Sequence, residues 1–245
     1  MRHGFDEINK RMKKAIVNHG LILDDQPIMI GLSGGKDSMT LLYALKQFQK
    51  ISKHKYALAA GHVSLGFPQD DIAPMVHFCQ KLDIPFFLEK TEIGAIIFDY
   101  RKETNPCSLC AKMRRGALNT LAKEHGFSKI ALAHHQDDVV ETLLLNLFYE
   151  GRMASFKPLT YLDRMELTVI RPFVYVPEEQ ISYFVRTTSL PICKSNCPQN
   201  CQGKRQEMKK IVAQLETLAP MGKDRVTGAL DRLFHSNWDG KEAMS

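Results

Sequence analysis

The sequence lacks the features that mark membrane and secreted proteins. Its apolar runs, such as Ala57–Ala60 and Leu143–Leu145, are far shorter than the roughly 20 residues that a membrane-spanning helix needs. The N-terminal residues include an early acidic residue, Asp6, and no apolar stretch of the kind found in signal peptides. There is no internal repeat and no low-complexity segment. We therefore expect a cytoplasmic protein that makes no membrane contact.

Two common nucleotide-binding patterns are also missing. A Walker A loop requires G-x-x-x-x-G-K-[ST], but Gly35-Lys36 is followed by Asp37, and Ile30 stands where the first glycine would be. The G-x-G-x-x-G pattern of dinucleotide-binding folds is absent as well. These absences argue against a P-loop NTPase and against a nicotinamide-dependent enzyme.

The composition is that of an ordinary globular protein. Of 245 residues, 44% are apolar and 24% are charged, which suits one domain or one domain with an appendage. The net charge of +6 is partly grouped, in residues 10–14, 112–115 and 204–210. This basic excess favours a polyanionic partner, although solvated helix faces would explain it equally well.

Short apolar runs alternate with helical patterns along most of the chain. We expect strands at Pro27–Leu32, Tyr56–Ser64, Pro85–Glu89, Lys129–Ala133 and Thr168–Arg171. We expect helices at 5–19, Lys36–Lys50, Ile72–Leu82, Met113–His125, Asp137–Glu150, Glu178–Thr188 and Gln202–Leu218. Such alternation predicts an α/β fold with a doubly wound, parallel, five-stranded sheet. The predicted division is an N-terminal helical segment (1–25), an α/β domain (26–190) and a basic, cysteine-containing C-terminal helical region (191–245) ending in a weakly structured tail.

The most informative motif is Ser33-Gly34-Gly35-Lys36-Asp37-Ser38, which lies between the first strand and the following helix. Two glycines let the backbone approach a phosphate, and a helix N-terminus offers unpaired N–H groups and a positive dipole end. The hydroxyls of Ser33 and Ser38 add donors, and Lys36 adds a cation. The motif resembles the S-G-G-x-D-S signature of the PP-loop ATP-pyrophosphatases. This resemblance implies that ATP is cleaved between its α- and β-phosphates, so that AMP is transferred to the substrate and pyrophosphate is released.

A second motif, His134-His135-Gln-Asp137-Asp138-Val-Val-Glu-Thr, follows the fourth strand and opens a helix. Carboxylates at a helix start could merely cap it. They could also hold Mg²⁺ that bridges the phosphates of ATP. The motif resembles H-H-x-D-D-x-x-E-T of two PP-loop subfamilies, the tRNA lysidine synthetases and the tRNA 2-thiocytidine synthetases.

The six cysteines distinguish between these subfamilies. Cys107 and Cys110 form a C-x-x-C, Cys193, Cys197 and Cys201 are spaced by four, and Cys79 stands alone as a core residue. In a cytosolic chain such clusters indicate metal or redox chemistry. Lysidine synthetases carry no such set, whereas the stretch from Cys107 to Gly116 resembles the 2-thiocytidine synthetases.

This second resemblance spans roughly residues 10–215 and implies a set of site residues. Cys107, Cys110 and Cys197 would hold a [4Fe–4S] cluster with one open iron, with Cys193 as the alternative third ligand. Arg114 stands where related thiolases keep a catalytic basic residue. The remaining implied residues are Ser33, Gly34, Gly35, Ser38 and His134 for ATP, and Lys36, Asp37, Asp137 and Asp138 for ATP, Mg²⁺ and catalysis.

The implied function is formation of 2-thiocytidine in the anticodon loop of a tRNA. The partners would be tRNA and a sulfur donor such as sulfide or a cysteine desulfurase, and a homodimer is compatible with the sequence. Two departures from the family stand out: the spacing around Cys197, and His62 and Ser64 where an acidic residue is usual. Four alternatives stay open: a structural zinc site, a uridine thiolase, a ligase or sulfurtransferase for a small molecule, and a non-catalytic nucleotide-binding sensor of redox state or metal.

Overall fold

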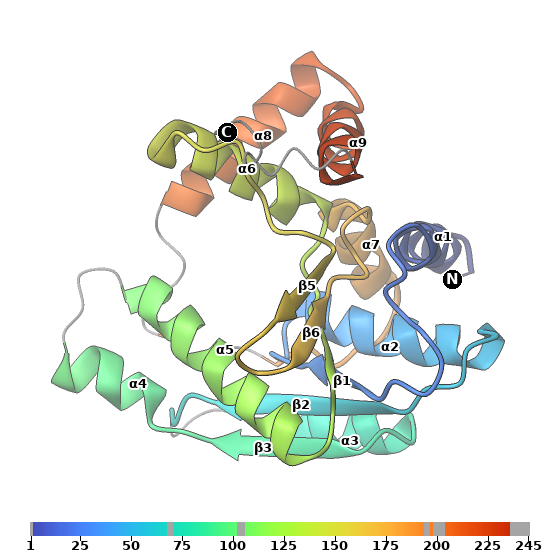
Figure 1. Cartoon of the computed structure of the whole chain (residues 1–245), viewed down its shortest axis with the longest axis vertical. Coiled ribbons are helices and arrows are strands. Elements are labelled where there is room, and N and C mark those ends of the chain that lie inside the picture. The colour runs from blue at the N-terminus through green and yellow to red at the C-terminus, as the bar shows by residue number, and fades with distance from the viewer. Residues whose placement is uncertain (1, 68–70, 102–105, 194–196, 198–203, 236–245) are drawn as a thin grey trace, which may run out of the picture.

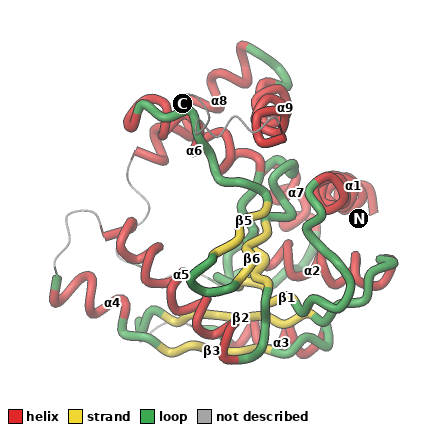
Figure 2. Tube along the Cα trace, viewed as in Figure 1, coloured by secondary structure: helices red, strands yellow, loops and turns green. Residues whose placement is uncertain are grey.

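The computed structural model describes residues 2–67, 71–101, 106–193, 197 and 204–235. Within these residues the chain forms a single twisted sheet with helices on both of its faces (Figures 1 and 2). No helix of the described part has the length and apolar character that would let it cross a bilayer.

The sheet has six strands in the order β3-β2-β1-β4-β6-β5. They are β1 (Ile28–Gly31), β2 (Leu58–Ser64), β3 (Phe86–Lys90), β4 (Lys129–Ala131), β5 (Leu159–Leu162) and β6 (Leu167–Ile170). All neighbouring pairs are parallel except β5 and β6. The register pairs Gly31 with Gly61 and Ala131 with Ile170, so the carboxyl ends of four strands share one edge. The α/β doubly wound fold class is thereby confirmed.

The expected number of strands was wrong. The sequence pattern predicts five strands; the sixth, β5, pairs antiparallel with β6 through a tight turn at Asp163–Glu166. Glu166 adopts a positive φ of 51° in this turn, a conformation for which glycine or asparagine would be the usual sequence signal. A four-residue strand without such a turn signal is hard to recognise from its pattern.

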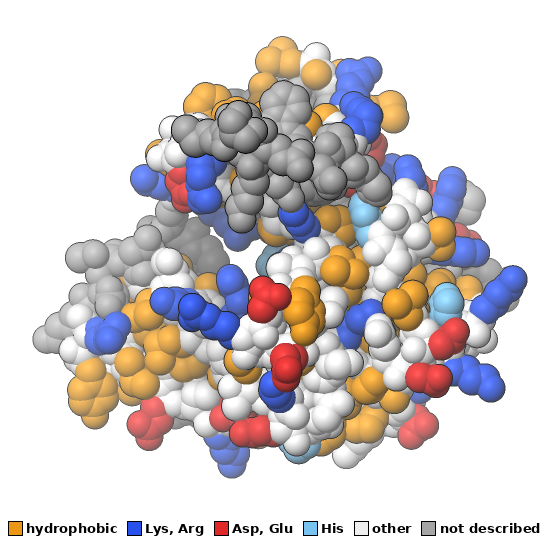
Figure 3. Space-filling view, in the orientation of Figure 1, with side chains coloured by type: hydrophobic (Ala, Val, Ile, Leu, Met, Phe, Trp, Pro, Cys, Tyr) orange, Lys and Arg blue, Asp and Glu red, His pale blue; other side chains and the backbone are white. Residues whose placement is uncertain are grey.

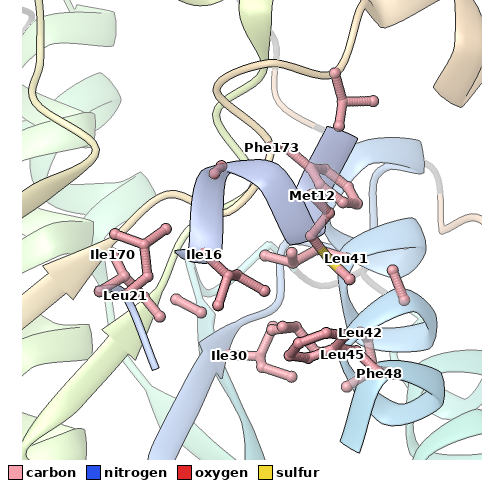
Figure 4. Close-up of a cluster of buried hydrophobic side chains, with 14 of the residues drawn as sticks. Met12, Ile16, Leu21, Ile30, Leu41, Leu42, Leu45, Phe48, Ile170 and Phe173 are labelled. Atoms are coloured by element: carbon pink, nitrogen blue, oxygen red, sulfur yellow. The ribbon is translucent and has the colours of Figure 1, made fainter. Parts of the chain in front are cut away.

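Helices α1 (Arg2–Asn18), α2 (Lys36–Ile51), α3 (Ala73–Lys81) and α7 (Glu178–Thr187) cover one face of the sheet. Their apolar sides form the larger core, to which Met12, Leu42, Phe173 and Ile30 of the central strand belong (Figure 4). Burying each such side chain stabilises the fold by about 1.5–3 kcal/mol. Helix α1 is thus built into the core of the α/β unit.

Helix α5 (Pro106–Glu124) covers the opposite face and forms a second core with α4 (Ile93–Ala95) and the π-helical turn at Ile96–Tyr100. Leu118 and Leu121 of α5 pack there against Met29 and Ile130 of the sheet. Helix α5 begins seven residues before the expected start at Met113. As a result, both cysteines of the C-x-x-C lie in its first turns.

Three helices form a layer beyond the carboxyl edge of the sheet (Figure 1). They are α6 (Gln136–Glu150), α8 (Lys204–Leu218) and α9 (Gly222–His235). Each contacts the other two. The sequence analysis expected a weakly structured tail after Leu218, and α9 corrects that expectation: Val226 and Leu230 bury its apolar side on the main core.

Candidate active site

The glycine loop has the geometry of an anion cradle. Gly34 has a φ of +82°, and a side chain there would bring its Cβ within 2.9 Å of the Cβ of Cys193. The hydroxyls of Ser33 and Ser38 lie 3.0 Å apart, and the Ser38 hydroxyl donates to the carbonyl of Gly35 at 3.1 Å. Because these bonds fix the turn at the start of α2, its amide groups are arranged before any anion arrives.

Lys36, the cation of this loop, is held between two carboxylates. Its Nζ lies 2.9 Å from Oδ1 of Asp37 and 2.9 Å from Oε1 of Glu178, and Lys209 pairs with the other oxygen of Glu178 at 2.6 Å. Burial alone would raise the pKa of Glu178, but the hydrogen bonds from Lys209 and Lys36 outweigh it and lower the pKa to about 2. Burial would lower the pKa of Lys36, yet the bonds to Asp37 and Glu178 raise it. Both partners therefore stay charged across the physiological range.

The start of α6 assigns different surroundings to the two adjacent aspartates. Asp137 accepts the backbone N–H of Glu178 at 2.7 Å on one oxygen and Lys223 Nζ at 2.8 Å on the other. Asp138 forms a capping box with His135, accepting the His135 N–H at 3.0 Å. Its second oxygen accepts Arg205 Nη2 at 2.9 Å. Asp137 thus joins α6 to α7 and α9, while Asp138 borders the cavity described next.

A cavity of about 340 Å³ opens at the junction of β1 and β4. This is the point where the strand order reverses direction, which is where doubly wound sheets bind ligands. Its polar lining comes from the glycine loop, from α5 and from the second motif: Ser33, Asp37, Ser38, Arg114, Arg115, His134 and Asp138. Gly31 and Gly61 form its floor, where the Cβ of a larger residue would clash with Leu118 and Met29. The volume and lining suit a nucleotide.

A second cavity of about 240 Å³ adjoins the first on the side of β2. Ser33, Val63 and Arg114 line both cavities, so the two are parts of one cleft. His62 lines the second cavity at the end of β2, and its Nδ1 lies 2.7 Å from the carbonyl of Leu32.

His134 borders the first cavity as a neutral imidazole. Burial lowers the pKa of His134 to about 4, although the nearby Asp138 carboxylate opposes this shift. Its ring packs on Phe156 with centroids 4.9 Å apart, and its Nδ1 is buried without a hydrogen-bond partner among the described residues. A neutral ring at this position can offer a hydrogen bond to a ligand without adding charge.

The structure separates the cysteines into two groups. Burial raises the pKa of the Cys110 thiol, the Arg114 cation opposes this shift, and the negative charges of Cys197 and Cys107 add to it. Cys107 and Cys197 therefore each lie within electrostatic range of Cys110. Cys193 lies elsewhere: its N–H donates to the Gly34 carbonyl at 3.0 Å, and it lines the second cavity. Cys201 falls outside the described residues.

Sequence reasoning placed the loop and the second motif correctly but missed the ion pairs around them. Arg205 and Lys209 belong to the basic group at 204–210 that favours a polyanionic partner, and they pair here with Asp138, Glu141 and Glu178. Lys223 pairs with Asp137 across 86 positions of sequence. No local sequence pattern indicates such partners, because each pair depends on how α8 and α9 pack against α6 and α7.

Comparison with known proteins identifies the family. Residues 5–214 match the PP-loop domain. The chain belongs to the PP-loop family. Over 229 residues it is 38% identical to the tRNA-cytidine(32) 2-sulfurtransferase of Syntrophotalea carbinolica, covering 92% of this chain and 88% of the relative. The corresponding protein of Geobacter sulfurreducens is 37% identical, with 92% and 89% covered. The resemblance to 2-thiocytidine synthetases that the motifs indicated is thereby confirmed.

A solved structure supports the same placement within the PP-loop family. The U34-tRNA thiolase NcsA from Methanococcus maripaludis, determined with its [4Fe–4S] cluster, superposes with a TM-score of 0.79 and 26% identity. The match covers 95% of this chain and 79% of NcsA. Thiolases with different target bases thus share the fold seen here.

Proposed function

We propose that this PP-loop protein catalyses the ATP-dependent thiolation of cytidine in a tRNA anticodon loop, releasing AMP and pyrophosphate. The observation that carries the proposal is the position of Arg114. Its side chain lines both cavities and lies within electrostatic range of Cys110. One cation therefore links the nucleotide cradle to the cysteine group, as a reaction that first adenylates a base and then thiolates it requires.

ATP would lie along the carboxyl edge of the sheet with its phosphates on the amide groups of Ser33–Ser38. The carbonyl oxygen of the target base attacks the α-phosphate, so that AMP becomes the group that leaves when sulfur replaces the oxygen. Lys36 and Arg114 stabilise the charge that develops on the phosphates. Asp138, which borders the cavity, would hold Mg²⁺, whereas Asp137 positions α7 and α9.

Among the described residues, no three histidine, cysteine or carboxylate side chains stand at distances that would hold a metal ion. The donor set nevertheless fits a cluster, because Cys107, Cys110 and Cys197 are soft thiol ligands and the first and last of them each lie within electrostatic range of Cys110. A [4Fe–4S] cluster held by three thiolates supplies an iron with an open coordination position for sulfide. Cys193, which packs on the glycine loop instead, is the less suitable third ligand.

The decisive experiment is thiolation in vitro with anaerobically reconstituted protein, unmodified tRNA, ATP, Mg²⁺ and sulfide. Nucleoside mass spectrometry should detect 2-thiocytidine in the digested tRNA. AMP and pyrophosphate should accumulate in the reaction mixture. Finding 2-thiouridine instead would establish the second candidate, which the likeness to NcsA favours. The proposal is refuted if protein that binds ATP and carries its cluster produces no thiolated nucleoside in the tRNA.

A pair of matched variants tests the cysteine assignment. Cys197→Ser should lose the visible absorbance of the reconstituted cluster, whereas Cys193→Ser should keep it. The opposite result would make Cys193 the third ligand in place of Cys197. Wild-type protein that is colourless and contains zinc would instead indicate a structural zinc site.

Three further expectations complete the proposal. Sulfide or a cysteine desulfurase would donate sulfur, the protein would act in the cytoplasm, and a homodimer stays compatible with the chain. The division at residues 1–25, 26–190 and 191–245 is proposed as a functional one, with the α/β domain binding ATP and the C-terminal region contributing Cys197. Limited proteolysis followed by mass spectrometry tests these boundaries.

A further inference from the structure

The far end of α6 carries exposed aromatic side chains that the proposed reaction does not use. Phe148 is 72% exposed and Tyr149 is 50% exposed, and Met153 beyond the helix end is 69% exposed. Gly151, with a positive φ of 63°, ends the helix and leaves these side chains at its tip. We call Phe148, Tyr149 and Met153 the aromatic tip.

A cation from a distant part of the sequence lies on this tip. The Nζ of Lys204, the first residue of α8, stands 4.1 Å from the centroid of the Tyr149 ring. The Glu150 carboxylate beside it is already paired with Arg152. The tip therefore combines exposed aromatic rings with a positive charge, a combination that suits stacked bases and their phosphates better than it suits an apolar protein surface.

The tip is connected to the cavity by α6 itself. Asp138 in the first turn borders the cavity, and the aromatic tip lies at the other end of the same 15-residue helix. Asp138 and Tyr149 are 11 residues apart, which is about 16 Å at 1.5 Å per residue, a distance that a few nucleotides of single strand can span. Arg115 of α5, which is exposed, also lines the cavity, and Figure 3 shows lysine and arginine side chains on both sides of the recess between the upper helices and the rest of the molecule.

We propose that the aromatic tip is a stacking platform for unpaired nucleotides that flank the target base of the RNA substrate. The inference rests on the proposed function, because it requires the target base to enter the cavity beside Asp138. Sequence-specific reading is not needed, since every base offers a π-face to Phe148 and Tyr149. The platform would hold the splayed loop while the target base is in the cavity.

Binding measurements with four variants test the platform. Phe148→Ala and Tyr149→Ala should each weaken the affinity for a fluorescent tRNA by about 5- to 150-fold, the range seen for loss of one stacked base. Phe148→Leu should weaken it similarly, because leucine keeps apolar area but cannot stack. The control Tyr161→Ala removes a tyrosine that is 54% exposed on β5 and should bind as wild type does. ATP affinity and the melting temperature should not change in any of them.

Salt dependence separates the role of Lys204 from that of the rings. In Lys204→Gln the slope of log K against log salt should fall by roughly 0.7–0.9, the value for one phosphate contact, whereas the aromatic variants should keep the wild-type slope. The platform is refuted if Phe148→Ala and Tyr149→Ala bind tRNA as Tyr161→Ala does. It is also refuted if sedimentation shows that they only convert a dimer into monomers, which would make the tip a contact between two copies. Wild-type protein that binds ATP but no tRNA would instead refute the proposed function.

Discussion

Glu178→Gln should destabilise the protein through the Lys36–Glu178–Lys209 bridge. The pKa of this carboxyl is about 2 in the folded protein against 4.5 for an ordinary glutamate. At about 1.4 kcal/mol per pKa unit, the bridge contributes roughly 3 kcal/mol at neutral pH. This figure is an upper bound for the variant, because glutamine keeps part of the hydrogen bonding. The Glu178 side chain is only 17% exposed, so solvent screens the pair weakly.

The stabilisation that Glu178 provides should depend on pH. A carboxyl with a depressed pKa contributes its full stabilisation above pH 4.5 and loses it as the pH falls towards about 2. At about pH 3.5 roughly 1.4 kcal/mol of the contribution should be gone from the wild type. The free-energy difference between wild type and Glu178→Gln should therefore narrow on acidification.

Urea unfolding at both pH values measures this difference. Glu179→Gln is the matched control, since it removes an exposed carboxylate from the same first turn of α7 and reports the helix-dipole effect alone. The reasoning is refuted if both variants lose the same stability at neutral pH, or if the loss in Glu178→Gln does not shrink at about pH 3.5.

Three further predictions concern the cavity. Gly34→Ala should lower the free energy of unfolding by about 1–3 kcal/mol and abolish ATP binding measured by calorimetry, because φ at Gly34 is +82° and Cys193 blocks the new Cβ. The control Gly116→Ala, where a Cβ meets open space, should stabilise α5 by up to about 1 kcal/mol. Asp138→Asn should remove the Mg²⁺ dependence of ATP binding with a small change in melting temperature, while Asp137→Asn should lower the melting temperature by several degrees; identical behaviour of the two would contradict the division of roles. Arg114→Gln should reduce the rate of AMP formation about 100-fold or more at unchanged ATP affinity, and an unchanged rate would remove Arg114 from the chemistry.

Sequence reasoning succeeded where function depends on a few consecutive residues. The turn at Ser33–Ser38 and the motif at His134–Asp138 each lie between a strand and a helix, so their local pattern fixes both their structure and their place on the sheet edge. Arg114 could be placed for the same reason, because its spacing from Cys110 lies within one helix.

The features that could not be predicted from the sequence depend on tertiary packing. Adjacent aspartates look equivalent in a sequence, yet the capping of α6 points Asp138 to the cavity and Asp137 to Lys223. Likewise, Cys193 and Cys197 are four positions apart, but Cys193 contacts the glycine loop whereas Cys197 lies within electrostatic range of Cys110. The strand β5 was missed because its turn uses Glu166 in a conformation for which glycine would be the usual signal.

The salt bridges of Arg205 with Asp138 and Glu141 have a consequence for how this protein can change. The C-terminal helices are fastened to the enzyme by the very motif that serves its chemistry. A substitution that loosens their attachment should also disturb Asp138, which lines the cavity that we propose for the nucleotide. Substitutions in this region should therefore change the turnover rate before they lower the stability of the fold.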